Sequence, residues 1–179
     1  LYGMNVEYLQ VPNDGSDSNA KVVADFLKEK AAGDPRKWIL VGYSKGTPDL
    51  QEALARFPEL RTLTAAFVSV AGASGGSNIA DAIPAMVDKY MNQYKLKPTC
   101  KGDMALGFKS LSKMVRGQFL ANYPNPFVPT YSVIAASDKN TTSKALLQTW
   151  QLLLTYDPLQ DGQLTRQDAI IPGSTYLGV

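Results

Sequence analysis

The sequence has no histidine in its 179 residues and a single cysteine, Cys100. A disulfide within the chain is therefore excluded, and the usual zinc ligands are almost absent, so no metal or other cofactor is expected. No apolar run approaches the roughly 18 residues that a transmembrane helix needs. Charge is nearly balanced, with 18 Lys and Arg against 16 Asp and Glu. This balance argues against nucleic acid or an anionic membrane as a partner.

The stretch at 38–46 reads WILVGYSKG. Its first four residues predict a buried strand, and the residues from 47 to 55 predict the start of a helix. A strand, G-x-S-x-G and a helix in this order are typical of a nucleophile elbow, which lifts a serine hydroxyl above the sheet. We therefore expect Ser44 to be a nucleophile. The other interpretation is an ordinary strand-to-helix turn in which the serine has no catalytic role. A phosphate-binding loop is not indicated, because the G-x-x-x-x-G-K-[ST] pattern is absent.

The residues around Ser44 have expected roles in such a turn. A side chain at Gly42 or Gly46 would clash with the flanking strand and helix, which explains both glycines. The N-terminus of the following helix favours negative charge near the serine. The backbone N–H of Lys45 can then donate to an oxyanion that forms on the substrate.

Strand and helix patterns alternate along the chain and predict an α/β fold. The expected strands lie at 4–11, 37–42, 64–71, 129–136 and 174–179, and the clearest helices at 19–30, 48–57 and 142–154. This alternation favours a mostly parallel sheet with right-handed crossovers and ligands at the carboxyl ends of its strands. A glycine-rich loop at 72–77 lies at such an end. It either lets backbone approach a ligand or is a plain flexible loop.

The pattern changes between residues 78 and 127, where roughly fifty residues separate two strands. This is far more than a crossover connection needs. Apolar residues at helical spacing predict a helical lid or cap, inserted into a core formed by residues 1–77 and 128–179. Its methionines and aromatic residues would line a pocket for an acyl group or, alternatively, form a small core of their own.

These features together resemble the α/β-hydrolase fold over essentially the whole chain. The resemblance rests on GYSKG at 42–46, Asp138, Asp161-Gly162 and the order of the elements. It implies a catalytic triad in the chain order serine, acid, histidine. Asp138 directly follows the strand at 129–136, whereas Asp161 lies in a loop similar to the acid loop of several bacterial lipases. We favour Asp161, although either aspartate could simply close a turn.

The resemblance also implies two parts that are not found in the chain. The family's histidine lies in the loop after the last strand, about where Val179 stands. The second oxyanion N–H follows a strand that would precede the first one here. We therefore expect this chain to be a central piece of a longer hydrolase. The partner that we expect for it is the remainder of its own polypeptide.

The function that the resemblance implies is cleavage of small carboxylic esters by an esterase- or lipase-like serine hydrolase. Ser44 would attack the carbonyl, a histidine outside these residues would take its proton, and Asp161 or Asp138 would orient that histidine. The alternative is a catalytically inactive, hydrolase-like binding module, for which the absence of histidine is the supporting feature.

Overall fold

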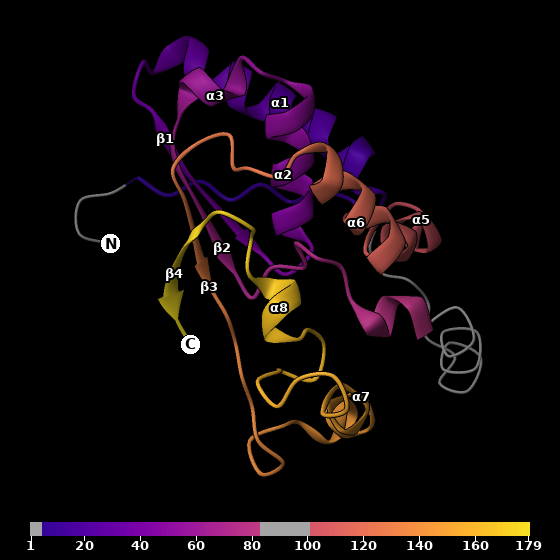
Figure 1. Ribbon diagram of the computed structural model, residues 1–179. Helices are drawn as coiled ribbons and strands as arrows, with labels where there is room; N and C mark the ends of the chain where they lie inside the picture. Colours follow the sequence, from indigo (N-terminus) through magenta and orange to yellow (C-terminus); the bar gives the residue numbers. More distant parts are fainter. Residues whose placement is uncertain (1–4, 83–100) are drawn as a thin grey trace.

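The computed structural model describes residues 5–82 and 101–179. Within these residues, four strands form one sheet in the order β1-β2-β3-β4, and each neighbouring pair is parallel (Figure 1). The strands are β1 (Trp38–Tyr43), β2 (Thr64–Val70), β3 (Thr130–Val133) and β4 (Thr175–Gly178). They lie within a few residues of four of the five expected strands. The predicted parallel α/β architecture is therefore confirmed.

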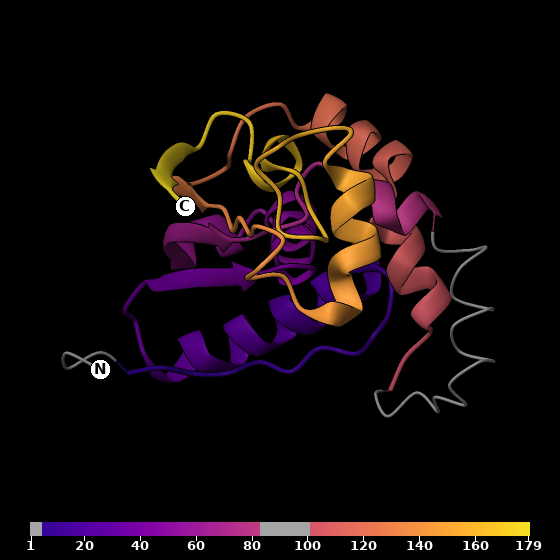
Figure 2. The ribbon, with the colours of Figure 1, turned by 90° about the horizontal axis from the view of Figure 1, so that it is seen from below.

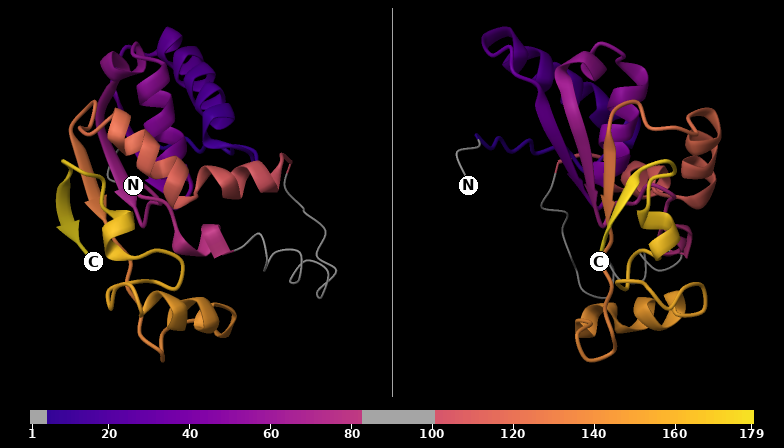
Figure 3. Two further views of the ribbon diagram at one scale, coloured as in Figure 1. Left: turned by 45° about the vertical axis from the view of Figure 1, so that its right-hand side comes forward. Right: turned by 60° about the vertical axis from the view of Figure 1, so that its left-hand side comes forward.

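The helices connect these strands and lie largely on one side of the sheet, as Figure 1 and the left panel of Figure 3 show for α1, α2 and α6. Residues 78–82 are also helical. The labelled helices are α1 (Ser16–Gly33), α2 (Gly46–Arg56), α3 (Leu60–Leu63), α5 (Met104–Ser110), α6 (Lys113–Asn122), α7 (Leu147–Leu153), which follows the short 3-10 helix η1 (Lys144–Leu146), and α8 (Arg166–Ala169).

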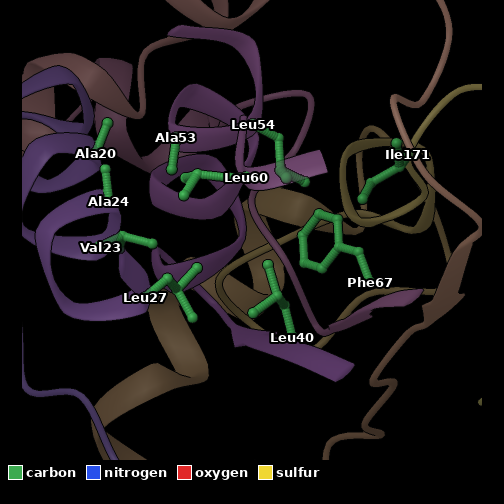
Figure 4. Packing of buried hydrophobic residues seen from close by; sticks show 10 residues of the cluster. All are labelled: Ala20, Val23, Ala24, Leu27, Leu40, Ala53, Leu54, Leu60, Phe67 and Ile171. Carbon is green, nitrogen blue, oxygen red and sulfur yellow. The ribbon is translucent and has the colours of Figure 1, made fainter. Parts of the chain in front are cut away.

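The main core lies between α1, α2 and the covered face of the sheet (Figure 4). Leu40 of β1 and Phe67 of β2 are paired in register, so both side chains point to this face. Burying a side chain of this size stabilises the fold by about 1.5–3 kcal/mol relative to exposure. The buried cluster comprises Ala20, Val23, Ala24, Leu27, Leu40, Ala53, Leu54, Leu60, Phe67 and Ile171.

The strand before the elbow is not buried on both sides, as its apolar run had predicted. Leu40 is buried, but Ile39, Val41 and Tyr43 are 57%, 63% and 69% exposed. Successive side chains of a strand point to opposite faces, and the described helices cover only the face of Leu40. The right panel of Figure 3 turns the opposite face forward. Within the described residues, β1 is also an edge strand, because β2 is its one neighbour.

The strand predicted at 4–11 is wrong for the residues that the structure describes. Residues 5–11 have no strand assignment, and Val6 and Tyr8 are exposed. A strand needs a neighbour for its backbone N–H and C=O groups. No described segment offers one beside these residues, so the alternating apolar pattern alone does not produce a strand.

The predicted insertion at 78–127 is described in part. The helical turn at 78–82, α5 and α6 agree with the helical spacing of the sequence. The Asp103 carboxylate caps α5 and the Ser112 hydroxyl caps α6, which supplies acceptors for otherwise unpaired N–H groups. Residues 83–100, with Cys100, lie outside the described residues. No described helix is long and apolar enough to span a bilayer.

Candidate active site

The G-x-S-x-G motif forms a tight turn between β1 and α2. The strand ends at Tyr43 and the helix begins at Gly46, so Ser44 and Lys45 make the whole turn. Ser44 has a φ of 49°, in the left-handed region that non-glycine residues seldom adopt. Such a conformation costs on the order of 1–3 kcal/mol and persists only where the surrounding structure enforces it.

Backbone hydrogen bonds from the end of β2 hold Ser44 in this conformation. The Ser44 N–H donates to the Val70 carbonyl at 3.1 Å, and the Ala73 N–H donates to the Ser44 carbonyl at 3.1 Å. Ala71, between these two partners, also has a positive φ, of 43°, and its N–H donates to the Val133 carbonyl of β3 at 2.8 Å. Three adjacent strands therefore fix the backbone of the serine.

The two glycines of the motif are not equivalent. A Cβ on Gly42 would lie 2.9 Å from both the Cα and the N of Thr47, which no real Cβ tolerates. At Gly46, by contrast, a Cβ would meet no atom of the described residues within 4 Å, outside its chain neighbours and its own helix backbone. The expected clash is thus present at Gly42 and wrong at Gly46.

The Thr47 side chain joins the strand and the helix directly behind the serine. Its hydroxyl donates to the Gly42 carbonyl at 3.0 Å and lies 3.0 Å from the Ser69 hydroxyl of β2. A Cβ on Gly72 would lie 2.2 Å from both of these hydroxyl oxygens. Thr47 and Ser69 are fully buried. Gly72 is therefore required because the two hydroxyls occupy the space that a side chain would need.

The Lys45 backbone N–H faces no acceptor among the described residues. It stands at the N-terminus of an 11-residue helix, where unpaired N–H groups and the helix dipole favour negative charge. The Lys45 ammonium is bound elsewhere: it donates to Asp49 at 2.8 Å, and Asp49 accepts a second bond from Asn19 at 2.9 Å. This leaves the backbone N–H, rather than the ammonium, as the candidate oxyanion donor.

The glycine-rich loop at 72–77 is a buried junction and not the plain flexible loop that was one of its two expected interpretations. The Gly75 N–H donates to the Asp168 carbonyl at 2.8 Å, and the Ser77 N–H donates to the Leu111 carbonyl at 2.9 Å. A Cβ on Gly76, whose φ is 87°, would lie 2.9 Å from the Leu111 oxygen. The glycines let the chain's own backbone approach closely. A flexible loop would not be buried and bonded in this way.

Asp161 lies in a half-buried turn that is connected to this junction. Its Oδ1 accepts from the N–H groups of Gln163 and Leu164, both at 2.8 Å. The Gln163 carbonyl in turn accepts from the Ser77 hydroxyl at 2.7 Å. The loop of Asp161 is thus bonded to the segment that also holds the Ser44 carbonyl. These contacts fix the orientation of the Asp161 carboxylate.

Asp138 follows β3 but is exposed. Its Oδ1 accepts from the N–H groups of Asn140 at 2.7 Å and Thr141 at 2.9 Å. These two bonds lower the pKa of Asp138 below its ordinary value. No hydrogen bond joins the Ser44 hydroxyl to Asp138 or Asp161, all three of which lie in the described residues. In Figure 2, which is seen from below, α7 lies beside the sheet and toward the viewer.

Asp168 and Arg116 are buried charged residues that were not found from the sequence. Asp168 is 3% exposed; it accepts from the Lys113 ammonium and, at 2.8 Å, from the Thr165 hydroxyl. Arg116 of α6 is fully buried and bonded to Ser74. The local sequence around the arginine, MVRGQFL, includes Gly and Gln, and its Met114 is 67% exposed, so it gave no signal that Arg116 is buried.

A hollow elsewhere in the molecule is not part of this site. It lies under α6, and its lining residues are mostly apolar; Ser44 is not among them. They are Gln51, Leu54, Phe67, Phe119, Leu120, Tyr123, Asn125, Pro126, Phe127, Thr130, Ile171 and Pro172.

The fold is similar to that of solved esterase and lipase structures. No family model and no curated protein matches the chain. It is similar to the solved structure of a metagenomic carboxyl esterase, MGS0156, with 32% identity and a TM-score of 0.86, over 99% of this chain and 53% of that chain. It is also similar to the mature lipase BlEst2 of Bacillus licheniformis, with 23% identity and a TM-score of 0.73, over 92% and 66% of the two chains.

A more distant likeness is to lipase B of Aspergillus fumigatus, with 14% identity and a TM-score of 0.56, over 95% of this chain and 36% of that chain. The lipase similarities, at these identities, concern the fold alone. This chain spans about half the length of the carboxyl esterase. It has the α/β-hydrolase fold of these esterase and lipase structures and corresponds to part of their length.

Proposed function

We propose that this chain is the nucleophile-bearing part of a serine hydrolase that cleaves carboxylic esters. The observation that carries the proposal is the left-handed Ser44 at the turn between β1 and α2. Strained conformations of this kind cluster at active sites, where the surrounding structure maintains them. The 32% identity to a carboxyl esterase supports esters as the substrate class.

The proposed reaction uses the groups at the elbow. The Ser44 Oγ attacks the ester carbonyl carbon while a base takes its proton, and the N–H of Lys45 donates to the carbonyl oxygen as it becomes negative. One donor of this kind lowers the barrier by about 2.7–4 kcal/mol. The base then returns the proton to the leaving alcohol. Water releases the acyl group from Ser44 in a second, equivalent step.

Asp161 is the acid that we favour. Its Oδ1 is fixed by two backbone N–H groups, which leaves Oδ2 to accept from a histidine. Its loop is bonded through Ser77 to the segment that holds Ser44. Asp138 has a comparable turn but is exposed, and its carboxylate accepts hydrogen bonds from that turn.

The base is proposed to be a histidine outside these residues, because the chain has none. The exposed apolar side chains Ile39 and Val41 and the open edge of β1 support further polypeptide on that side of the sheet. An unpaired sheet edge with apolar neighbours is a surface that proteins normally cover. We also propose that the segment at 78–127 forms a lid or cap over the ester site.

The test is ester hydrolysis by the intact protein, together with the mass of every chain that copurifies with it. Ser44→Ala should abolish turnover of a short p-nitrophenyl ester. Ser143→Ala is a matched control, because Ser143 is exposed and its side chain caps nothing. Hydrolysis that persists in Ser44→Ala would exclude the assignment. A purified protein that contains no histidine yet hydrolyses the ester through Ser44 would contradict the proposed base.

A second candidate is a hydrolase-like module that binds esters without cleaving them. The observation that favours it is again the absence of histidine from the 179 residues. Such a module would bind the p-nitrophenyl ester without releasing nitrophenol. Turnover that depends on Ser44 would exclude this candidate.

A further inference from the structure

A closed ring of hydrogen bonds connects α6, α2 and the junction loop at 72–77. The Nε of Arg116 donates to the Ser74 carbonyl at 3.0 Å, and its Nη2 donates to the Gln51 Oε1 at 2.7 Å. The Gln51 Nε2 completes the ring by donating to the Ser74 hydroxyl at 3.0 Å. All three residues are buried, and Arg116 and Ser74 are fully buried. The ring therefore fixes three segments relative to one another.

The burial of Arg116 is not an efficient source of stability. Burial lowers the pKa of Arg116 to about 10, an effect that the charges of Glu52 and Asp49 partly offset, so the guanidinium remains charged at neutral pH. Its Nη1 makes no hydrogen bond with the described residues, and the nearest carboxylate oxygen, of Glu52, is 3.7 Å away. A buried ion pair often contributes no more than an apolar substitute would. Such an arrangement is better explained by the geometry that it imposes.

That geometry reaches Ser44 along two routes. Ser74 directly follows Ala73, whose N–H donates to the Ser44 carbonyl. Gln51 lies on α2, whose first turn forms the other side of the elbow. Because Ser44 is held in a left-handed conformation by such contacts, a shift in either segment would move its hydroxyl.

On the basis of the proposed function, we propose that Arg116 is a positioning residue for Ser44. It couples the segment that contains α6 to the elbow by fixing Ser74 and Gln51. Arg116 does not touch the reacting atoms. Its effect is on the orientation of the serine, and it makes the pose of the nucleophile depend on the packing of α6.

The test compares Arg116→Met in the intact protein with a matched arginine variant. Arg61 also donates to α2, to the carbonyls of Leu54 and Ala55 at 2.8 and 3.2 Å, and lies over an aromatic ring. Its contacts are at the far end of that helix from Ser44. Arg61→Met should therefore lower the melting temperature and leave turnover unchanged.

The readouts are kcat and KM for a p-nitrophenyl ester and the rate at which a fluorophosphonate labels Ser44. For Arg116→Met we expect kcat and the labelling rate to fall together by about 10- to 100-fold, because a displacement near 1 Å has this effect on a reacting group. KM should change little. Arg116→Lys, which keeps the charge but cannot bond both partners at once, should give an intermediate loss.

Ser74→Ala provides a second variant, because it removes one bond of the ring without exposing a buried charge. A smaller fall in kcat, of about 3- to 10-fold, is expected. The positioning role is overturned if kcat in Arg116→Met or Ser74→Ala stays within about twofold of wild type. It is also overturned if kcat falls as much in Arg61→Met as in Arg116→Met. If the wild-type protein shows no ester hydrolysis that depends on Ser44, the proposed function itself is contradicted.

Discussion

At the scale of single residues, the space around Gly42 decides whether the elbow can close. A Cβ there would press on the backbone of Thr47, whereas Gly46 has open space beside it. We expect Gly42→Ala to lower the free energy of unfolding by about 1–3 kcal/mol, as overpacking does, and to reduce ester turnover. Gly46→Ala should change both by much less. Thermal unfolding and p-nitrophenyl ester assays measure the difference, and equal effects would contradict the geometry described for the turn.

The two candidate acids can be separated by removing one charge at a time. If Asp161 orients the catalytic histidine, Asp161→Asn should lower kcat on the order of 10⁴-fold, as loss of the triad carboxylate does in other serine hydrolases. Asp138→Asn should leave kcat nearly unchanged, since Asp138 serves its own turn. Steady-state kinetics on both variants decide the matter. The reverse order of effects would assign the role to Asp138.

The turn role of Asp138 has a dependence on pH. The pKa of Asp138 is lowered in the folded protein, first by its bond from Thr141 and then by that from Asn140. The ionised form is thus favoured by folding, so its contribution is present above the ordinary pKa of 3.8 and is lost as the pH falls through the lowered pKa. The melting temperature of Asp138→Asn should be slightly below that of wild type at pH 7, and the two melting temperatures should converge in acid. A difference that stays constant with pH would contradict this account.

Residues whose role is local could be identified from the sequence, and those whose role is tertiary could not. GYSKG carries its own context, so Ser44 was found at the strand-to-helix turn where the structure has it. The sequence contains no reason to pair Lys45 with Asp49 beyond their i, i+4 spacing. It gave none to pair Arg116 with Ser74, because these residues are 42 positions apart.

At the scale of elements, the Thr47 hydroxyl connects β1, α2 and β2. It bonds the Gly42 carbonyl and the Ser69 hydroxyl in a fully buried place. Thr47→Val would leave these groups without partners, and we expect a loss of about 1–3 kcal/mol in unfolding free energy. Thr62→Val is the control, because Thr62 bonds the Glu59 carbonyl on the surface. Chemical denaturation measures both, and a tolerated Thr47→Val would mean that the hydroxyl is dispensable.

The elements themselves were predicted unevenly. The strand patterns at 64–71 and 129–136 predicted β2 and β3, although β3 covers only Thr130–Val133 and its buried side chains are the polar Thr130 and Ser132. The same reasoning failed for the exposed side of β1 and for residues 5–11. Whether a run becomes a buried strand depends on neighbours that its own sequence does not specify.

At the scale of the whole molecule, the uncovered face of the sheet has a consequence for stability. If further polypeptide covers β1, then Val41→Lys in the intact protein would bury a charge and lower the free energy of unfolding by more than about 2 kcal/mol. Val22→Lys is the control, since Val22 lies at the surface of α1. Thermal unfolding of the two variants tests this. A harmless Val41→Lys would mean that the face is open to solvent in the intact protein.

The sequence led to the right fold for the whole chain because the elbow and the order of the strands are characteristic together. It placed the histidine outside these residues, and the similarity to a chain of which this one covers 53% is compatible with that proposal. The identity of the ester is not encoded in any local pattern. It depends on the shape of a site to which residues far apart in the chain contribute.

The most direct test of the central claim is to treat the intact protein with a fluorophosphonate and locate the adduct by peptide mass spectrometry. The account predicts a single adduct on Ser44, its absence from Ser44→Ala, and parallel loss of ester hydrolysis. An adduct on another residue, or hydrolysis by a protein in which Ser44 stays unmodified, would contradict the claim that the serine between β1 and α2 is the nucleophile.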